Sequence, residues 1–207
     1  MPTYELDITF DTAGLDALNA SGQKVTIVKQ SSGGKQTAWI TFTRQLANSV
    51  TWTEQYSVYS STTNAQAGAK IITSSEATAI GGSSYTLNTS GYFDAGVPGI
   101  VGPTQYQIFN GDPDLLIGST PMVTGGLVQG ASVNGATVSA PMCAVGILYN
   151  QTAQFTPIET VLVYTSSYSD NGIVISSVAG NALTVQYTTN TTASITYNDQ
   201  NNQFIMS

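Results

Sequence analysis

Two glutamates, Glu54 and Glu159, are the residues of this sequence whose types and spacing best suit acid–base chemistry. A pair of carboxylates held about 5 to 10 Å apart can hydrolyse a glycosidic bond, with one group acting as acid and the other as base or nucleophile. The alternative is that both glutamates lie at strand starts, exposed or bonded to backbone amides. The sequence favours this alternative, because carboxylates at sheet ends are common, and we therefore assign no catalytic residue and expect no enzyme.

The segments that begin at these glutamates resemble each other. Glu54 leads into Gln-Tyr-Ser-Val-Tyr-Ser-Ser and Glu159 into Thr-Val-Leu-Val-Tyr-Thr-Ser-Ser, 105 residues later. One interpretation is a duplication, with half-repeats around 38–75 and 144–178. The other is that polar hairpins converge on such strings through composition alone, and the sequence leaves both open.

Trp39 is the leading candidate for ligand binding. It alternates with Thr37, Thr41 and Thr43, which places it on the polar face of a predicted strand. An exposed indole beside hydroxyls can stack on the apolar face of a sugar ring. The alternative is that a helix or loop covers this face, as for most tryptophans. The predicted ligand-binding residues are Trp39, Thr41, Tyr59, Tyr164, Tyr92 and Asp94.

A weak metal pattern follows at Asn110, Asp112 and Asp114, where three oxygen side chains stand at alternate positions. Calcium prefers oxygen ligands, but the sequence does not continue as a calcium-binding loop, since Leu115 and Pro121 stand where glycine and glutamate are required. A proline-containing turn is the favoured interpretation. We predict no metal and no cofactor.

Composition excludes several classes of function. The chain has no histidine and a single cysteine, Cys143, which rules out histidine-based catalytic triads and thiolate metal clusters. The formal charge is −7, and no basic residue follows Lys70. Binding to nucleic acid or to an anionic membrane requires clustered cations, so neither partner is expected. Neutral glycans or glycolipids remain as expected partners, and the chain could also form a homo-oligomer.

The elements that must position these residues are predicted to be strands. Apolar and polar residues alternate over most of the chain, which indicates an all-β protein with an antiparallel sandwich or jelly-roll-like fold. One short helix is predicted near residues 12–21, capped by Asp11 or Thr12 and ended by Gly22. We predict one domain, 1–207, with an irregular excursion rich in glycine and proline at 91–141.

These features predict a non-enzymatic carbohydrate-binding protein, lectin-like, for recognition or defence. The first alternative is a membrane-acting β-toxin of the pore-forming or insecticidal type, and the second is a self-assembling structural β-protein. The N-terminus lacks the basic and apolar regions of a signal peptide, so we expect cytoplasmic synthesis, with release from the cell left open.

Overall fold

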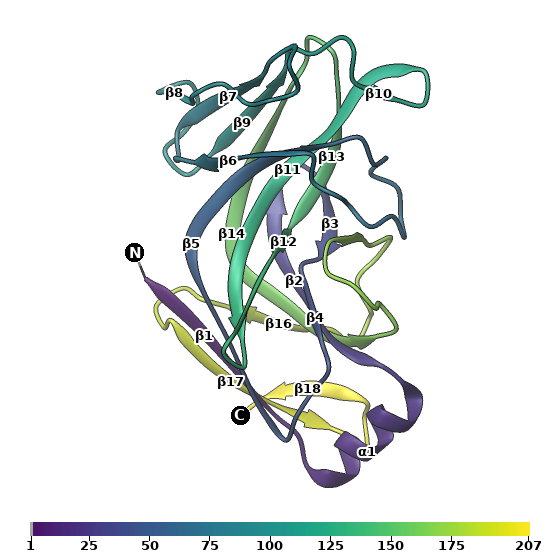
Figure 1. Ribbon diagram of the computed structural model, residues 1–207. Coiled ribbons are helices and arrows are strands. Elements are labelled where there is room, and N and C mark those ends of the chain that lie inside the picture. Colours follow the sequence, from purple (N-terminus) through teal and green to yellow (C-terminus); the bar gives the residue numbers. More distant parts are fainter. Residues whose placement is uncertain (1) are drawn as a thin grey trace.

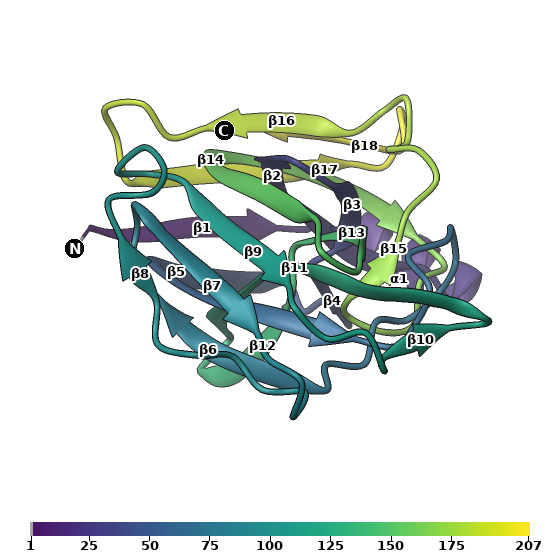
Figure 2. The ribbon, with the colours of Figure 1, turned by 90° about the horizontal axis from the view of Figure 1, so that it is seen from above.

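The computed structural model describes residues 2–207 and is built almost entirely from strands, with 57% strand and 5% helix (Figure 1). The predicted all-β, sandwich-like fold is confirmed: two strongly curled sheets enclose a common core (Figures 1 and 2). The predicted helix is α1 (Thr12–Ser21). Asp11 caps it by accepting a 2.7 Å hydrogen bond from the Gly14 amide, and Gly22 ends it in the left-handed conformation.

The strands form two sheets. The order in the first sheet is β15 (Ile173–Val174), β3 (Lys35–Ala38), β13 (Cys143–Leu148), β11 (Thr120–Val133), β5 (Ala47–Ser61), β1 (Thr3–Thr9), β17 (Thr192–Asn198) and β18 (Gln203–Met206). Three further strands pair outside this order: β6 (Ser75–Ala79) with β5, and β10 (Leu116–Ile117) and β12 (Ala136–Pro141) with β11.

The order in the second sheet is β4 (Ile40–Phe42), β2 (Lys24–Ser32), β14 (Thr152–Ser166), β9 (Tyr106–Asn110), β7 (Ser83–Leu87) and β8 (Val97–Pro98), and β16 (Leu183–Gln186) also pairs with β14. Two pairings are parallel, β1 with β17 and β7 with β9, and the others in these two orders are antiparallel. Within residues 2–207, no helix has the length and apolar character needed to cross a bilayer.

The two sheets share one strand arrangement. The run β11-β5-β1-β17-β18 of the first sheet matches the run β2-β14-β9-β7-β8 of the second, position by position. The parallel pairing occurs at the same place in both runs, since β1 with β17 matches β9 with β7. The extra pairings match as well, because β6 lies beside β5 and β16 beside β14.

The pairing registers match at the level of single residues. Leu6 pairs with Val50, and Tyr106, 100 residues after Leu6, pairs with Phe155, 105 residues after Val50. The chain segments that follow β5 and β14 also pair with each other, through a bridge between Lys70 and Ile173. Corresponding segments that pair with each other in antiparallel fashion lie across a local twofold axis. The fold is therefore two similar halves related by a pseudo-twofold axis.

The outer faces of both sheets are partly covered. The chain after β14 packs on the second sheet in a cluster that contains Leu162, Tyr164 and Ile175, and the chain after β5 forms a similar cluster with Tyr59 and Ile71. Strands in these places are buried on both faces. Alternation of polar and apolar residues therefore does not identify a solvent-exposed face here.

The predicted irregular excursion 91–141 is wrong over residues 120–141, which contain β11 and β12. Residues 123–129 of β11 are buried in succession, because this strand is covered on both faces, and so the sequence does not alternate. Gly126 lies in the middle of the strand, where a Cβ atom would stand 2.1 Å from the Cys143 carbonyl oxygen. A glycine that looks like a loop residue is here required by a close approach of backbones.

Candidate functional site

Two β-bulges place Glu54 and Glu159. The register of β5 against β11 shifts between Trp52 and Tyr56, and that of β14 against β2 shifts between Pro157 and Val161. These two bulges are 105 residues apart, so they are counterparts in the two halves, and each glutamate is the middle residue of its bulge. Bulges re-aim side chains and are frequent beside functional sites. Both glutamates thus depart from the alternating side-chain directions of their strands, at equivalent positions in the two halves.

Glu159 is bonded to a buried lysine. The Lys29 ammonium donates to Glu159 Oε2, and the side chain of Lys29 is fully buried while that of Glu159 is 18% exposed. The Lys29 Nζ also lies 5.1 Å from the centre of the Trp52 ring and 5.6 Å from that of Tyr4, within the range of cation–π attraction. Burial lowers the pKa of Lys29, and the neighbouring Glu159 carboxylate opposes this shift.

Further donors fix both carboxylates. The Tyr56 hydroxyl donates to Glu159 Oε1 over 2.9 Å, and the Trp52 indole N–H approaches Oε2 at 3.4 Å. The Tyr4 hydroxyl donates to Glu54 Oε1. Burial, together with the nearby glutamates, raises the pKa of Tyr4 and of Tyr56. Both tyrosines therefore act as neutral hydrogen-bond donors to the carboxylates.

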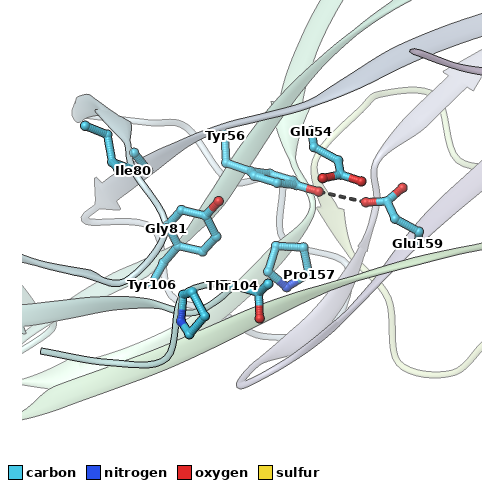
Figure 3. Close-up of a pocket in the computed structure, with 10 residues that line it drawn as sticks. Glu54, Tyr56, Ile80, Gly81, Thr104, Tyr106, Pro157 and Glu159 are labelled. Carbon is cyan, nitrogen blue, oxygen red and sulfur yellow. Dashed lines mark hydrogen bonds between the residues drawn. The ribbon is translucent and has the colours of Figure 1, made fainter. Parts of the chain in front are cut away.

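A pocket of about 420 Å³ opens beside the two glutamates (Figure 3). Glu54 and Glu159 lie at one end, where the Tyr56 hydroxyl reaches Glu159, and Ile80 lies at the other end. The remaining wall residues are Tyr56, Ala79, Gly81, Pro103, Thr104, Tyr106 and Pro157. The pocket thus combines hydrogen-bond acceptors at one end with apolar walls, which is the usual composition of a small-molecule site.

The predicted exposure of Trp39 is wrong. Trp39 is 1% exposed, its indole N–H donates to the Gln129 carbonyl over 3.0 Å, and its ring packs edge-on against Trp52. It lies between β3 and β4, where Ala38, Trp39 and Ile40 are all buried, because both faces of this segment are covered. Trp52, against which the Trp39 ring packs, is also buried, at 2% exposed.

Three other predicted ligand-binding residues are engaged within the protein. Tyr59 is fully buried and donates to the Cys143 carbonyl over 2.8 Å, and Tyr164 is 3% exposed. Both belong to the outer clusters described above, which is why their predicted role at an open surface is wrong. Thr41 is half-buried, and its amide and hydroxyl both donate to the Asn171 side chain.

Tyr92 and Asp94 are exposed, but they lie away from the glutamate pocket, in the loop after β7. Asp94 accepts a 2.8 Å hydrogen bond from the Asn88 side chain, and Asn88 also accepts from the Ser90 amide within the same loop. A binding role for these two residues stays a prediction.

The predicted turn at residues 110–114 is confirmed. Asn110 Oδ1 accepts from the Asp112 amide, and Asp112 Oδ1 accepts from the amides of Asp114 and Leu115. These side-chain oxygens cap the turn. Over residues 2–207, no group of three or more acidic, cysteine or histidine side chains is arranged to hold a metal ion.

The favoured expectation that Glu54 and Glu159 lie at strand starts, exposed or bonded to backbone amides, is wrong, because both lie within long strands and accept from side chains. Sequence reasoning also missed Lys29, Tyr4 and Tyr106 as their neighbours. Lys29 ends an apolar run, Val-Thr-Ile-Val-Lys, in a predicted strand, and its neighbours Val28 and Ile27 are fully buried. A lysine in such a run is rarely buried without a partner. This was the signal that could have indicated an ion pair with one of the glutamates.

Comparison of the chain with protein-family models, with characterised proteins and with solved structures finds no match.

Proposed function

We propose that the protein is a non-enzymatic, lectin-like binding protein whose ligand places a neutral hydroxylated ring, a carbohydrate, in the pocket beside Glu54 and Glu159. The observation that carries the proposal is the pocket itself, in which two carboxylates face a cavity with apolar walls. A ring with hydroxyl donors on its edge and apolar C–H groups on its faces is complementary to such a surface.

The charge of the pocket supports a neutral ligand. Lys29 compensates the charge of Glu159, whereas Glu54 is bonded to the neutral hydroxyl of Tyr4. An anionic ligand would be repelled by the remaining charge, and a hydroxyl group can donate a charge-assisted hydrogen bond to it. Charge-assisted bonds are about twice as strong as bonds between neutral groups.

The hydrogen bonds of the two carboxylates favour binding over hydrolysis. A glycosidase needs one carboxylic acid that keeps its proton until it delivers it to the leaving group. Glu159 accepts from an ammonium, a phenol and an indole, and Glu54 accepts from a phenol. All these groups donate, so each carboxylate already serves as a hydrogen-bond acceptor within the protein. Both glutamates are therefore built as acceptors.

A glycan array tests the proposal, followed by titration of each glycan that binds. Glu54→Gln removes the charge at the pocket and should weaken glycan binding by about tenfold or more, the loss of a hydrogen bond to a charged group. Glu76→Gln is the matched control, since Glu76 is exposed and outside this pocket. An array without any binding, or equal binding by both variants, would contradict the proposal.

A further inference from the structure

The glutamate pocket has a counterpart in the other half of the molecule, and that counterpart is filled. Pro157 of the pocket corresponds to Trp52, as the registers of β14 and β5 show. The residue correspondence between the two halves can be extended past the ends of the paired strands. Thr104 then corresponds to Tyr4, and Gly81 corresponds to Tyr187. Three small or short residues thus stand on the open side, where the filled side has three aromatic residues.

The three aromatic residues pack tightly on one another. The Tyr4 and Trp52 rings are stacked with their centres 5.7 Å apart, and Tyr187 meets both edge-on, at 5.4 Å from Tyr4 and 5.2 Å from Trp52. None of the three is more than 7% exposed. The hydroxyl of Tyr4 reaches Glu54, the glutamate of the bulge on the filled side.

We propose that the open pocket binds a phenolic ring, whose hydroxyl donates to Glu159 as the hydroxyl of Tyr4 donates to Glu54. This inference shares with the proposed function the premise that the pocket takes a hydroxylated ring, and it goes beyond the carbohydrate proposal by naming the ring that the filled half displays. The ligand ring occupies the space that Tyr4 and Trp52 fill in the other half. The contacts of the Tyr4 side chain in the filled half thus indicate how the ligand binds in the open half.

Glu159 has an acceptor position left for this hydroxyl. Each carboxylate oxygen can accept two hydrogen bonds, and among the described residues Oε1 of Glu159 accepts only that of Tyr56. The carboxylate lines the pocket and is partly exposed. A phenol is a strong donor, so its bond to the carboxylate is of the charge-assisted kind.

The walls suit an aromatic ring. Tyr106 contributes a ring that packs edge-on against Tyr56, and aromatic pairs of this kind prefer such contacts over flat stacking. Pro103, Pro157 and the exposed Ile80 provide the apolar contacts that, in the filled half, the aromatic rings provide for one another. The ring of a phenol needs no further hydrogen-bond partners within these walls.

The test uses p-cresol, which is the tyrosine side chain as a free molecule, with toluene as the same ring without the hydroxyl. Titration is followed by NMR, through the signals of Tyr56 and Tyr106, whose rings line the pocket. A ligand of this size is expected to bind at about millimolar concentration. We expect saturable binding of p-cresol at least about tenfold tighter than that of toluene, from the hydrogen bond to a charged acceptor. Equal binding of the two, or no saturation by p-cresol, would overturn the inference.

Pro157→Trp places in the open pocket the kind of side chain that Trp52 contributes to the filled half, and it should abolish p-cresol binding. Pro121→Trp makes the same change at an exposed position outside the pocket and should leave it intact. Circular dichroism and thermal unfolding establish whether Pro157→Trp folds. If this variant does not fold, Thr104→Tyr fills the pocket from another side, and Thr43→Tyr at an exposed position is its control. Undiminished p-cresol binding by a folded filling variant overturns the inference.

The two proposals fail separately. If a glycan binds and Glu54→Gln weakens it while p-cresol does not bind, the phenolic inference falls and the carbohydrate proposal stands. If p-cresol binds to the unsubstituted protein but not to Pro157→Trp, while the glycan array shows no binding, the carbohydrate proposal falls and the phenolic inference stands.

Discussion

Lys29 and Gln129 occupy corresponding places in the two halves of the molecule, each paired with the residue that ends a glutamate-bearing bulge. Both are buried, but they have different partners: Lys29 bonds to the Glu159 carboxylate, and the Gln129 amide donates to the Thr53 carbonyl over 2.8 Å. Glu159 therefore has its charge neutralised by a buried lysine, and Glu54 has no such partner at the corresponding place. The difference leaves Glu54 as the uncompensated charge of the pocket.

The first prediction concerns this ion pair. Lys29→Met leaves the Glu159 carboxylate without its cation and should lower the free energy of unfolding by about 3–5 kcal/mol. The double variant Lys29→Met/Glu159→Gln removes both charges and should recover most of that loss, since a buried pair contributes little net stability. Urea unfolding measures both effects.

The exposed pair of Lys70 and Asp170 provides the control, because its side chains are 53% and 48% exposed. Lys70→Met should change the free energy of unfolding by less than about 1 kcal/mol. A Lys29→Met variant as stable as Lys70→Met would contradict the view that the buried pair is tightly coupled.

The second prediction concerns Trp39. Its ring is fully enclosed and its N–H is bonded to the Gln129 carbonyl, so Trp39→Ala should destabilise the protein by about 3–5 kcal/mol, like the loss of any buried large aromatic. Thermal and urea unfolding measure the change. A loss below about 1 kcal/mol would be typical of a surface residue and would contradict the burial of Trp39.

The burial of Trp39 shows why the alternation of polar and apolar residues does not predict exposure in this strand. Alternation gives the relative faces of Trp39 and its neighbours only if the strand is regular and one face meets water. Here β3 ends at Ala38, β4 begins at Ile40, and a second cluster covers the outer face. Tyr59 and Tyr164 are buried for the same reason, since chain segments far along the sequence return to cover them.

The equivalence of Glu54 and Glu159 was one of the two interpretations that the sequence left open, since the two similar segments begin 105 residues apart. The sequence did not predict the pocket. It depends on the bulges, and on the aromatic residues of one half being replaced by Thr104, Pro157 and Gly81 in the other, which becomes visible only when the pairing registers relate the halves. Nothing in the local sequence around these three residues marks a site.

The third prediction concerns the mouth of the pocket. A Cβ atom on Gly81 would stand 2.2 Å from the Pro103 carbonyl oxygen, so Gly81→Ala must displace the turn that carries Pro103 and Thr104. We expect a loss of about 1–3 kcal/mol in the free energy of unfolding, together with weaker ligand binding. Gly180→Ala is the control, because a Cβ there meets no atom within 4 Å and requires no unusual backbone angle. Equal stability of the two variants would show that the turn is not held against Gly81.

The last prediction concerns alkaline pH. Burial raises the pKa of seven tyrosines in the folded state, in the case of Tyr164 to about 12; the others are Tyr4, Tyr56, Tyr59, Tyr106, Tyr187 and Tyr197. In the unfolded chain tyrosines ionise near pH 10. Their contribution to stability is therefore complete below about pH 10 and is lost as the pH rises through the folded values.

Lys29 has the opposite sign, since burial lowers its pKa and the unfolded chain then binds the additional proton. Arg44, whose pKa is also lowered by burial, has the same sign as Lys29. Two such groups do not offset seven, so we expect the free energy of unfolding, measured with urea, to fall steadily above about pH 10. Tyr164→Phe should make this fall less steep, because it removes one of the seven groups, and should cost little stability, because the buried Tyr164 hydroxyl has no hydrogen-bond partner within residues 2–207. A free energy of unfolding that stayed constant up to about pH 11 would contradict the burial of these hydroxyls.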